Sequence, residues 1–336
     1  MPAIGVMKNN RSMSKRVLAS ILLSLSALPA VWAQYPDKPV TLVVPFAAGG
    51  PSDKIARDLA EALRKPLGQT VIVDNTAGAG GTIGAARVAR AKADGYTLLV
   101  HHIGLATAPA LYKKLPYDTL KDFEYLGLVN EAPSVLIGRT TLAANNLAEL
   151  RKWVADSGGR VNLANAGVGS ASHLCGLMLQ SALKSKMVAV PYKGTAPAMT
   201  DLIGGQVDLM CEQATNAVPQ IEGKKVKVYG VSSKERLNLP SLAQTPTLAE
   251  AGLADFNVTV WHGVYAPHGT PPEVLARLNA ALREALKDPE LIKRQEALGL
   301  RLVTDARLGA AGHKAYVQAE MARWGKVIKD SGETAE

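Results

Sequence analysis

The chain has 336 residues, of which 47% are hydrophobic and 20% are charged, and its formal net charge at pH 7 is +9. This length is large for one hydrophobic core and comfortable for two domains. The basic residues are scattered and no basic block is interleaved with aromatic residues, so we expect no nucleic-acid partner. A modest positive charge suits an anionic small molecule.

The N-terminal segment has the pattern of a secretory signal peptide. A basic pair precedes an apolar run, Val17–Leu28, which is too short to span a bilayer comfortably. The run ends in Val31–Ala33, with small residues at the two positions that a signal peptidase inspects. We therefore expect residues 1–33 to be a secretory signal that is cleaved during export. The sequence leaves open whether translation begins at Met1 or Met13.

After this segment, the sequence predicts a strand, a glycine loop and a helix. Val40–Val44 is an apolar β-rich run, Phe46–Gly50 is a loop of small residues, and Ser52 or Asp53 is expected to cap the helix. Glycine lets a ligand approach the backbone closely. The free N–H groups of a helix's first turn carry a partial positive charge. We therefore expect an anion to bind at this loop.

Strands and helices continue to alternate after the first helix. Further strands are expected at Val71–Val73 and Tyr96–Val100. This alternation predicts a parallel sheet covered on both faces, with ligands at the carboxyl ends of the strands. The loops at those ends are Phe46–Asp53, Asn75–Gly81 and His101–Thr107.

A second α/β pattern follows two short β-like runs, Tyr125–Val129 and Ser134–Gly138. Asn257–Ala266 is an extended run that we expect to return to the first domain, and amphipathic helices follow it. The strands predicted in the second pattern are Val161–Ala164, Val188–Val190, Val207–Met210 and Val226–Val231.

Four loop-to-helix junctions share one chemistry, namely glycine, a hydroxyl and exposed helix N–H groups. One helix end favours a carboxylate by roughly 0.3–1 kcal/mol, whereas micromolar binding needs about 8 kcal/mol. Several ends must therefore converge, and two facing domains would bring them together across a cleft. Any one junction alone is better explained as an ordinary capped helix, whereas four at equivalent positions favour a binding site. The junctions are Gly49–Asp53, Gly78–Thr82, Gly167–His173 and Lys193–Pro197.

Two enzymatic interpretations compete with binding. Gly78–Gly84 resembles a dinucleotide loop, but Ile83 stands where the third glycine belongs, so we expect no nucleotide cofactor. Ser170, Ser172 and His173 suggest a hydrolase, but no G-x-S-x-G elbow is present. His173 is either a donor to a ligand carboxylate or a helix-capping or core histidine. A hydrolase or nucleotide-dependent enzyme on a two-domain scaffold remains the alternative function.

The cysteine pair leaves two interpretations open. Cys175 and Cys211 are the only cysteines, and export makes a disulfide possible. The other interpretation is two small buried side chains. The two cysteines with His173 and Glu212 have a spacing that matches no familiar metal site. The pair His101–His102 is an equally weak candidate for a metal site. We expect no metal.

Glu212 is expected just after the Val207–Met210 strand. There it either receives an amine or hydroxyl of a ligand or leaves the sheet into solvent. The side chains of Trp261 and Tyr192 either face the ligand or only pack against other residues of the protein.

Short motifs occur in order from about Tyr35 to the C-terminus. They are Tyr35-Pro-Asp-Lys-Pro-Val, Pro45-Phe-Ala-Ala-Gly-Gly with Asp53, Ala77-Gly-Ala-Gly-Gly, Asp94-Gly-Tyr-Thr-Leu, Leu115-Pro-Tyr-Asp, Ser172-His-Leu, Val190-Pro-Tyr-Lys-Gly-Thr-Ala-Pro-Ala, Gly204-Gly-Gln-Val-Asp-Leu-Met, Pro246-Thr-Leu-Ala-Glu-Ala-Gly and Ala266-Pro-His-Gly-Thr-Pro. The combination resembles the Bordetella uptake gene family, the extracytoplasmic solute receptors of tripartite tricarboxylate transporters.

The resemblance implies a type II periplasmic-binding-protein fold, in which two α/β lobes are joined by a two-crossover hinge. The ligand carboxylate would lie in the cleft between the lobes, held partly through ordered water. The lobes would be residues 34–133 plus 257–336 and residues 134–256. The resemblance further implies no catalysis, no cofactor and a membrane permease as partner. A monomer is the simplest state that presents both lobes to a permease.

The family's binding residues transfer to this sequence position by position. Ala47-Ala48 and Cys211-Glu212-Gln213 depart from the common family pattern, so the ligand is left as a dicarboxylate, a tricarboxylate, an aromatic carboxylate or an acidic amino acid. The expected ligand-binding residues are Phe46, Ala47, Gly50, Ser52, Asp53, Ala79, Gly80, His101, Gly169, Ser170, Ser172, His173, Lys193, Gly194, Thr195 and Glu212.

Overall fold

The computed structural model describes residues 1–5 and 35–335 of the chain. The chain divides into two compact units, Met1–Asp37 and Lys38–Glu336. The apolar run of the predicted signal peptide and its cleavage site lie outside the described residues. Among the described residues, no helix combines the length and apolar character that a membrane span requires. All elements below belong to the second unit.

A ten-stranded sheet forms the centre of the second unit, in the order β2-β1-β3-β9-β4-β7-β5-β6, with β10 and β8 also paired to β4. Pairing is parallel among β1, β2 and β3 and again among β5, β6 and β7. The two predicted α/β patterns are therefore confirmed. The strands are β1 (Val40–Val44), β2 (Val71–Asn75), β3 (Thr97–His102), β4 (Phe123–Gly138), β5 (Asn162–Asn165), β6 (Val188–Pro191), β7 (Leu209–Gln213), β8 (Lys227–Val231), β9 (Thr259–Pro267) and β10 (Arg301–Leu302).

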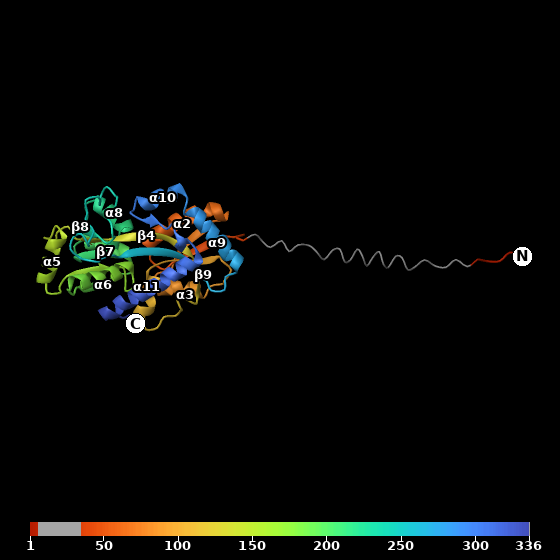
Figure 1. Ribbon diagram of the computed structural model, residues 1–336, viewed down its shortest axis with the longest axis horizontal. Coiled ribbons are helices and arrows are strands. Elements are labelled where there is room, and N and C mark those ends of the chain that lie inside the picture. The colour runs from red at the N-terminus through yellow and green to blue at the C-terminus, as the bar shows by residue number, and fades with distance from the viewer. Residues whose placement is uncertain (6–34, 336) are drawn as a thin grey trace. The chain divides into compact units, whose positions relative to one another are not determined.

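Helices cover both halves of this sheet. Figure 1 shows α2, α3 and α9 around one half and α5, α6 and α8 around the other. The helices are α2 (Pro51–Leu67), α3 (Thr82–Ala89), α4 (Gly104–Leu111), α5 (Leu147–Asp156), α6 (Ala171–Leu183), α7 (Thr195–Ile203), α8 (Ala214–Glu222), α9 (Pro272–Ala285), α10 (Pro289–Glu296) and α11 (Ala310–Ser331), with 3₁₀ turns η1 (Ala79–Gly81) and η2 (Ala306–Leu308).

The long strand β4 joins the two halves. The sequence predicts two separate runs here, Tyr125–Val129 and Ser134–Gly138, and this prediction is wrong because β4 is continuous. Its residues up to Pro133 pair with β9, and from Ser134 onward they pair with β7 and β8. Pro133 lies where the pairing partner changes. A strand tolerates proline at a place where the ladder does not need its N–H group.

Helix α2 follows the predicted apolar pattern but begins differently. Ile55, Leu59 and Leu63 recur every four residues and are buried against the sheet. The predicted cap at Ser52 or Asp53 is wrong, because Gly50 occupies the cap position and Pro51 opens the helix. Proline suits the first helical position, since its fixed φ is already helical and its missing N–H would have no partner there.

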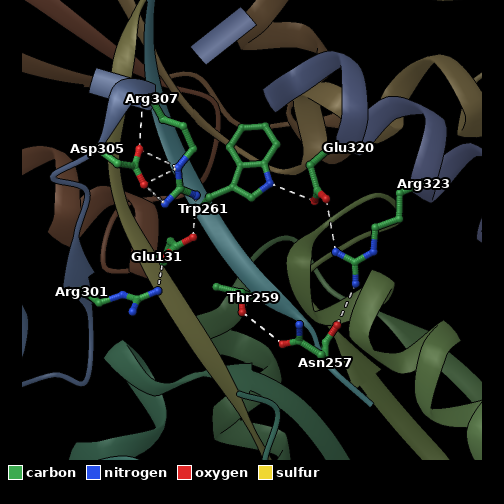
Figure 2. A network of polar contacts seen from close by, with 9 residues as sticks. All are labelled: Glu131, Asn257, Thr259, Trp261, Arg301, Asp305, Arg307, Glu320 and Arg323. Atoms are coloured by element: carbon green, nitrogen blue, oxygen red, sulfur yellow. Dashed lines mark hydrogen bonds and ion pairs between the residues drawn. The ribbon is translucent and has the colours of Figure 1, made fainter. Parts of the chain in front are cut away.

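Arginines from the C-terminal part of the chain brace β4 near the crossing between the halves (Figure 2). Glu131 of β4 forms ion pairs with Arg301 at 2.6 Å and Arg307 at 2.7 Å. Burial alone would raise the pKa of Glu131, but the hydrogen bonds and charges of the two arginines lower it below its usual value. The carboxylate therefore stays ionised and holds β10 and η2 against β4.

Helix α11 braces the second crossing, at β9. Arg323 donates to the carbonyl of Asn257 at 2.9 Å and pairs with Glu320, and Glu320 also accepts from the buried indole of Trp261 (Figure 2). Trp261 therefore packs inside the protein rather than facing a ligand.

A disulfide joins α6 to β7. Cys175 and Cys211 are bonded, with their Cα atoms 5.9 Å apart, which settles the question that the sequence left open. It closes a loop between residues 36 apart in sequence and fixes the N-terminal half of α6 beside the middle of β7.

We expect the double substitution Cys175→Ala/Cys211→Ala to lower the free energy of unfolding by about 2–4 kcal/mol, because the unfolded chain regains the entropy of the open loop. Urea denaturation at pH 7 measures this change. Dithiothreitol should shift the wild-type midpoint in the same direction and leave the variant unchanged. An unfolding midpoint equal to that of the oxidised wild type would contradict the prediction.

Candidate functional site

Two adjoining hollows form one cleft, which we call the candidate cleft. Its inner cavity measures about 30 Å³ and its outer hollow about 660 Å³. Phe46, Ala47, Ala166 and Gly194 line both, so the hollows are continuous. The remaining lining residues of the inner cavity are Gly50, Ser52, His102, Ser170, Ala171, Ser172, Thr195, Glu212 and Gln213.

Most of the predicted binding residues meet at this cleft. Nine line the inner cavity: Phe46, Ala47, Gly50, Ser52, Ser170, Ser172, Gly194, Thr195 and Glu212. Three more, Ala79, Gly80 and Lys193, line the outer hollow. The other four, Asp53, His101, Gly169 and His173, line neither hollow.

The starts of three helices meet at the inner cavity. Helix α2 begins at Pro51, α6 at Ala171 with Ser170 as its cap, and α7 at Thr195. The Ser170 hydroxyl accepts from the N–H of His173 at 3.2 Å, as expected of an N-cap. Each start brings unpaired backbone N–H groups and the positive end of a helix dipole. A cavity bounded by three such ends favours an anion.

Glycine lets the two walls of the cleft approach each other at Gly80. Its φ is +61°, and a Cβ there would lie 2.2 Å from the carbonyl oxygen of Val168 and 2.6 Å from the hydroxyl of Tyr112. The Tyr112 hydroxyl donates a hydrogen bond to the same carbonyl oxygen at 3.1 Å. Gly80 thus allows a contact between the wall that follows β2 and the wall that precedes α6.

Asp53 supports the glycine loop from behind. Its carboxylate accepts from the N–H of Gly49 at 2.9 Å, from Arg57 at 3.0 Å and from the Asn75 amide at 3.0 Å. Burial alone would raise its pKa, but these hydrogen bonds lower it below the usual value. Asn75 also donates to the carbonyl of Phe46. The network holds the loop in place, and Asp53 does not line the inner cavity.

His102, not the predicted His101, lines the inner cavity. Side chains of adjacent strand residues point to opposite faces, so only one of the pair can face the cleft. His102 stacks on Phe46 with ring centroids 4.3 Å apart, and its Nδ1 accepts from the N–H of Gly104 at 2.8 Å. Burial lowers its pKa to about 3. The neutral ring therefore carries its proton on Nε2.

His173 is held by protein groups on both sides of its ring. Its Nδ1 accepts from the N–H of Gly169 at 3.3 Å, and its Nε2 lies 3.3 Å from a carboxylate oxygen of Glu333. Burial lowers its pKa below the usual value, and Glu333 opposes this shift. Of the two predicted roles, this geometry matches the core histidine. In the described part of the chain, no group of histidine, cysteine and acidic side chains could hold a metal.

Glu212 lies inside strand β7 and not beyond its end. The predicted exit into solvent is wrong, because β7 extends to Gln213 and Glu212 is only 2% exposed. Thr195 donates to its carboxyl group at 3.3 Å. Burial raises the pKa of Glu212 to about 8, so the side chain is mostly neutral at pH 7. A neutral acid at this position does not repel an anion in the cavity.

The expected binding residues left out four residues that line the inner cavity, namely His102, Ala166, Ala171 and Gln213. Period-two alternation along β3 could have separated His102 from His101. Gln213 was hidden because the predicted strand ended at Met210. Ala166 and Ala171 have no chemistry that a sequence pattern could reveal.

Residues 55–333 match the model of a family described as the tripartite tricarboxylate transporter family receptor. The fold is similar to that of the periplasmic binding protein BugD, with a TM-score of 0.86 and 46% identity over 90% of this chain and 100% of BugD.

Two structures from Rhodopseudomonas palustris with bound acids are also similar. MatC with bound malate has a TM-score of 0.83 and 41% identity, over 88% of this chain and 100% of MatC. Rpa4515 with adipate has a TM-score of 0.84 and 31% identity, over 89% of this chain and 98% of Rpa4515.

Because the carboxyl group of Glu212 is buried, its ionisation should lower the free energy of unfolding as pH rises. Its pKa of about 8 in the folded protein exceeds the ordinary value of 4.5, so this loss of stability is absent below about pH 4.5 and grows as pH rises toward 8. We expect Glu212→Gln to raise the free energy of unfolding at pH 8 by on the order of 4 kcal/mol relative to its effect at pH 4.5. Urea denaturation at both pH values measures the difference. An equal effect at both would contradict a neutral, buried Glu212.

Proposed function

The chain belongs to the tripartite tricarboxylate transporter receptor family, and we propose that it captures a small organic carboxylate in the candidate cleft for delivery to a membrane permease. It is a solute-binding receptor and not an enzyme. The three residues that suggested a hydrolase form no Ser–His side-chain pair. The hydroxyl groups of Ser170 and Ser172 hydrogen-bond to each other, and His173 Nδ1 accepts from the N–H of Gly169.

The convergence of three helix starts on one cavity is the observation that supports carboxylate binding there. One helix end contributes roughly 0.3–1 kcal/mol, and up to about 2 kcal/mol when partly buried. Three ends together with direct hydrogen bonds approach the 8 kcal/mol or so that micromolar affinity requires. Neutral His102 and Glu212 add no negative charge. MatC and Rpa4515, which are similar to this chain, hold malate and adipate.

The strand pairing supports a division into lobes of residues 34–133 plus 257–336 and residues 134–256. The pairing partners of β4 change between Pro133 and Ser134, and β9 begins at Thr259. On this division, α2 belongs to one lobe and α6 and α7 belong to the other. A ligand in the inner cavity would contact both lobes.

The two hollows of the candidate cleft together would hold the acid. The inner cavity, at about 30 Å³, has room for roughly one water-sized group, so the rest of a dicarboxylate would extend into the continuous outer hollow of about 660 Å³. We propose that an acid enters an open form and stabilises a closed one, because both lobes contact it only when closed.

Export and partnership belong to the same proposal. The N-terminal pattern of a signal peptide supports a periplasmic location, and the similar protein BugD is a periplasmic binding protein. A transporter's permease subunits are the proposed partner, and a monomer suffices to present both lobes to them.

A thermal-shift panel of residues 34–336 tests the proposed function. Malate, succinate, citrate, adipate, benzoate, aspartate and glutamate are each added at high concentration. A ligand at 100 times its dissociation constant adds about 2.7 kcal/mol to the folded state, which raises the midpoint visibly. We expect one class of acid to raise it without being consumed. If none did, and a carboxylate ester were hydrolysed instead, the proposed receptor function would be wrong.

Gly50 offers a matched pair of variants at the cavity wall. A Cβ there would lie 3.4 Å from the nearest atom, the carbonyl oxygen of Ala47, and φ is −82°, so a small side chain fits. We expect Gly50→Asp to weaken carboxylate binding at least 100-fold, since it adds like charge in the site. Gly50→Asn has the same size without the charge and should lose less than tenfold. Calorimetric titration measures both, and equal losses would place the carboxylate elsewhere.

A further inference from the structure

A continuous chain of buried polar side chains runs from the candidate cleft to the surface of α2. Ser52 Oγ lies 3.1 Å from His262 Nε2, and His262 Nδ1 lies 3.0 Å from Asn130 Oδ1. Asn130 Nδ2 donates to Gln295 Oε1 at 2.7 Å, and Gln295 Nε2 donates to Asp58 Oδ2 at 3.0 Å. All but Asp58 are at most 2% exposed. The chain leaves α2 at Asp58 and returns to it at Ser52.

The direction of every hydrogen bond follows from the carboxylate at one end. A carboxylate oxygen only accepts, so Gln295 presents its NH₂ group to Asp58 and its carbonyl to Asn130. Asn130 then presents its NH₂ group to Gln295 and its carbonyl oxygen to His262. That oxygen requires a proton on His262 Nδ1.

The imidazole completes the sequence of donors. Burial, together with the neighbouring His102, lowers the pKa of His262 well below its usual value, so the ring is neutral and carries one proton. With that proton on Nδ1, Nε2 has only a lone pair. The Ser52 hydroxyl must therefore donate its single hydrogen to His262.

Ser52 consequently offers the cleft only lone pairs. Any group placed against its oxygen must bring its own hydrogen. An independent observation agrees with this requirement. Gln213 also lines the inner cavity, is 4% exposed, and its Oε1 has no hydrogen-bond partner among the described residues. A buried acceptor without a partner is costly unless a ligand or water donates to it.

We propose that Asp58, acting through Gln295, Asn130 and His262, fixes Ser52 as a hydrogen-bond acceptor and so selects carboxylates that bear a hydroxyl or amino group. The helix starts receive the carboxylate, and Ser52 with Gln213 receives the donor group. This inference rests on the proposed function for its ligand, but not for the direction of the hydrogen bonds. Asp58, Gln295, Asn130 and His262 are positioning residues.

The tautomer of His262 tests the direction without any ligand. In ¹⁵N-labelled protein, one-bond coupling to hydrogen identifies the protonated ring nitrogen, and we expect Nδ1. Asp58→Asn can donate as well as accept, so it should populate the Nε2–H tautomer of His262 to a measurable extent. Glu61→Gln is the matched control, because Glu61 is an exposed carboxylate on the same helix whose ion pair is with Arg64. A wild-type proton on Nε2 overturns the proposal, as does a tautomer that Asp58→Asn leaves unchanged.

Ligand pairs test the selectivity. Malate and aspartate differ from succinate by one hydroxyl and one ammonium group. We expect wild-type protein to bind at least one of the two about tenfold more tightly than succinate, and Ser52→Ala to remove most of that preference. An unchanged ratio in Ser52→Ala overturns the selectivity. If no acid binds at all, the proposed function fails and the selectivity fails with it, while the tautomer result still decides the direction of the hydrogen bonds.

Discussion

The starts of α2, α6 and α7 bring the positive ends of three helices to one small cavity, and the surrounding chemistry is consistent with an anion there. Two of the three helices follow strands from the second α/β half and one follows a strand from the first. Their meeting depends on β4 and β9, the strands that pass between the halves and are braced by Glu131, Arg323 and Glu320. The disulfide between α6 and β7 holds the second wall. The site is therefore a product of strand order more than of any single motif.

Neutral buried groups complete the electrostatics. His102 and His262 carry no charge because burial lowers their pKa values, and Glu212 is mostly uncharged at pH 7 because burial raises its pKa. Binding strength would then come from backbone N–H groups and dipoles, which are fixed by the fold. Selectivity would come from the few side chains whose donor or acceptor role is set by their partners, as at Ser52.

Sequence reasoning predicted the alternating α/β pattern, because apolar runs and glycine-rich turns are local signals. It also placed the loops at the strand ends, since parallel strands leave no other place for them. It failed where the outcome depends on distant partners. The continuity of β4 through Pro133 depends on a change of neighbouring strand, and the burial of Glu212 depends on the length of β7. The hydrogen-bonded chain from Asp58 to Ser52 joins residues up to 237 positions apart, which no spacing rule could reveal.

If one carboxylate bridges the two halves of the protein, a crystal structure of residues 34–336 with the acid that most stabilises the protein will show the bridge. We expect the carboxylate within hydrogen-bond distance of a backbone N–H group at the start of α2 and of another at the start of α6 or α7. An acid bound to one half only, or outside the candidate cleft, would contradict this expectation.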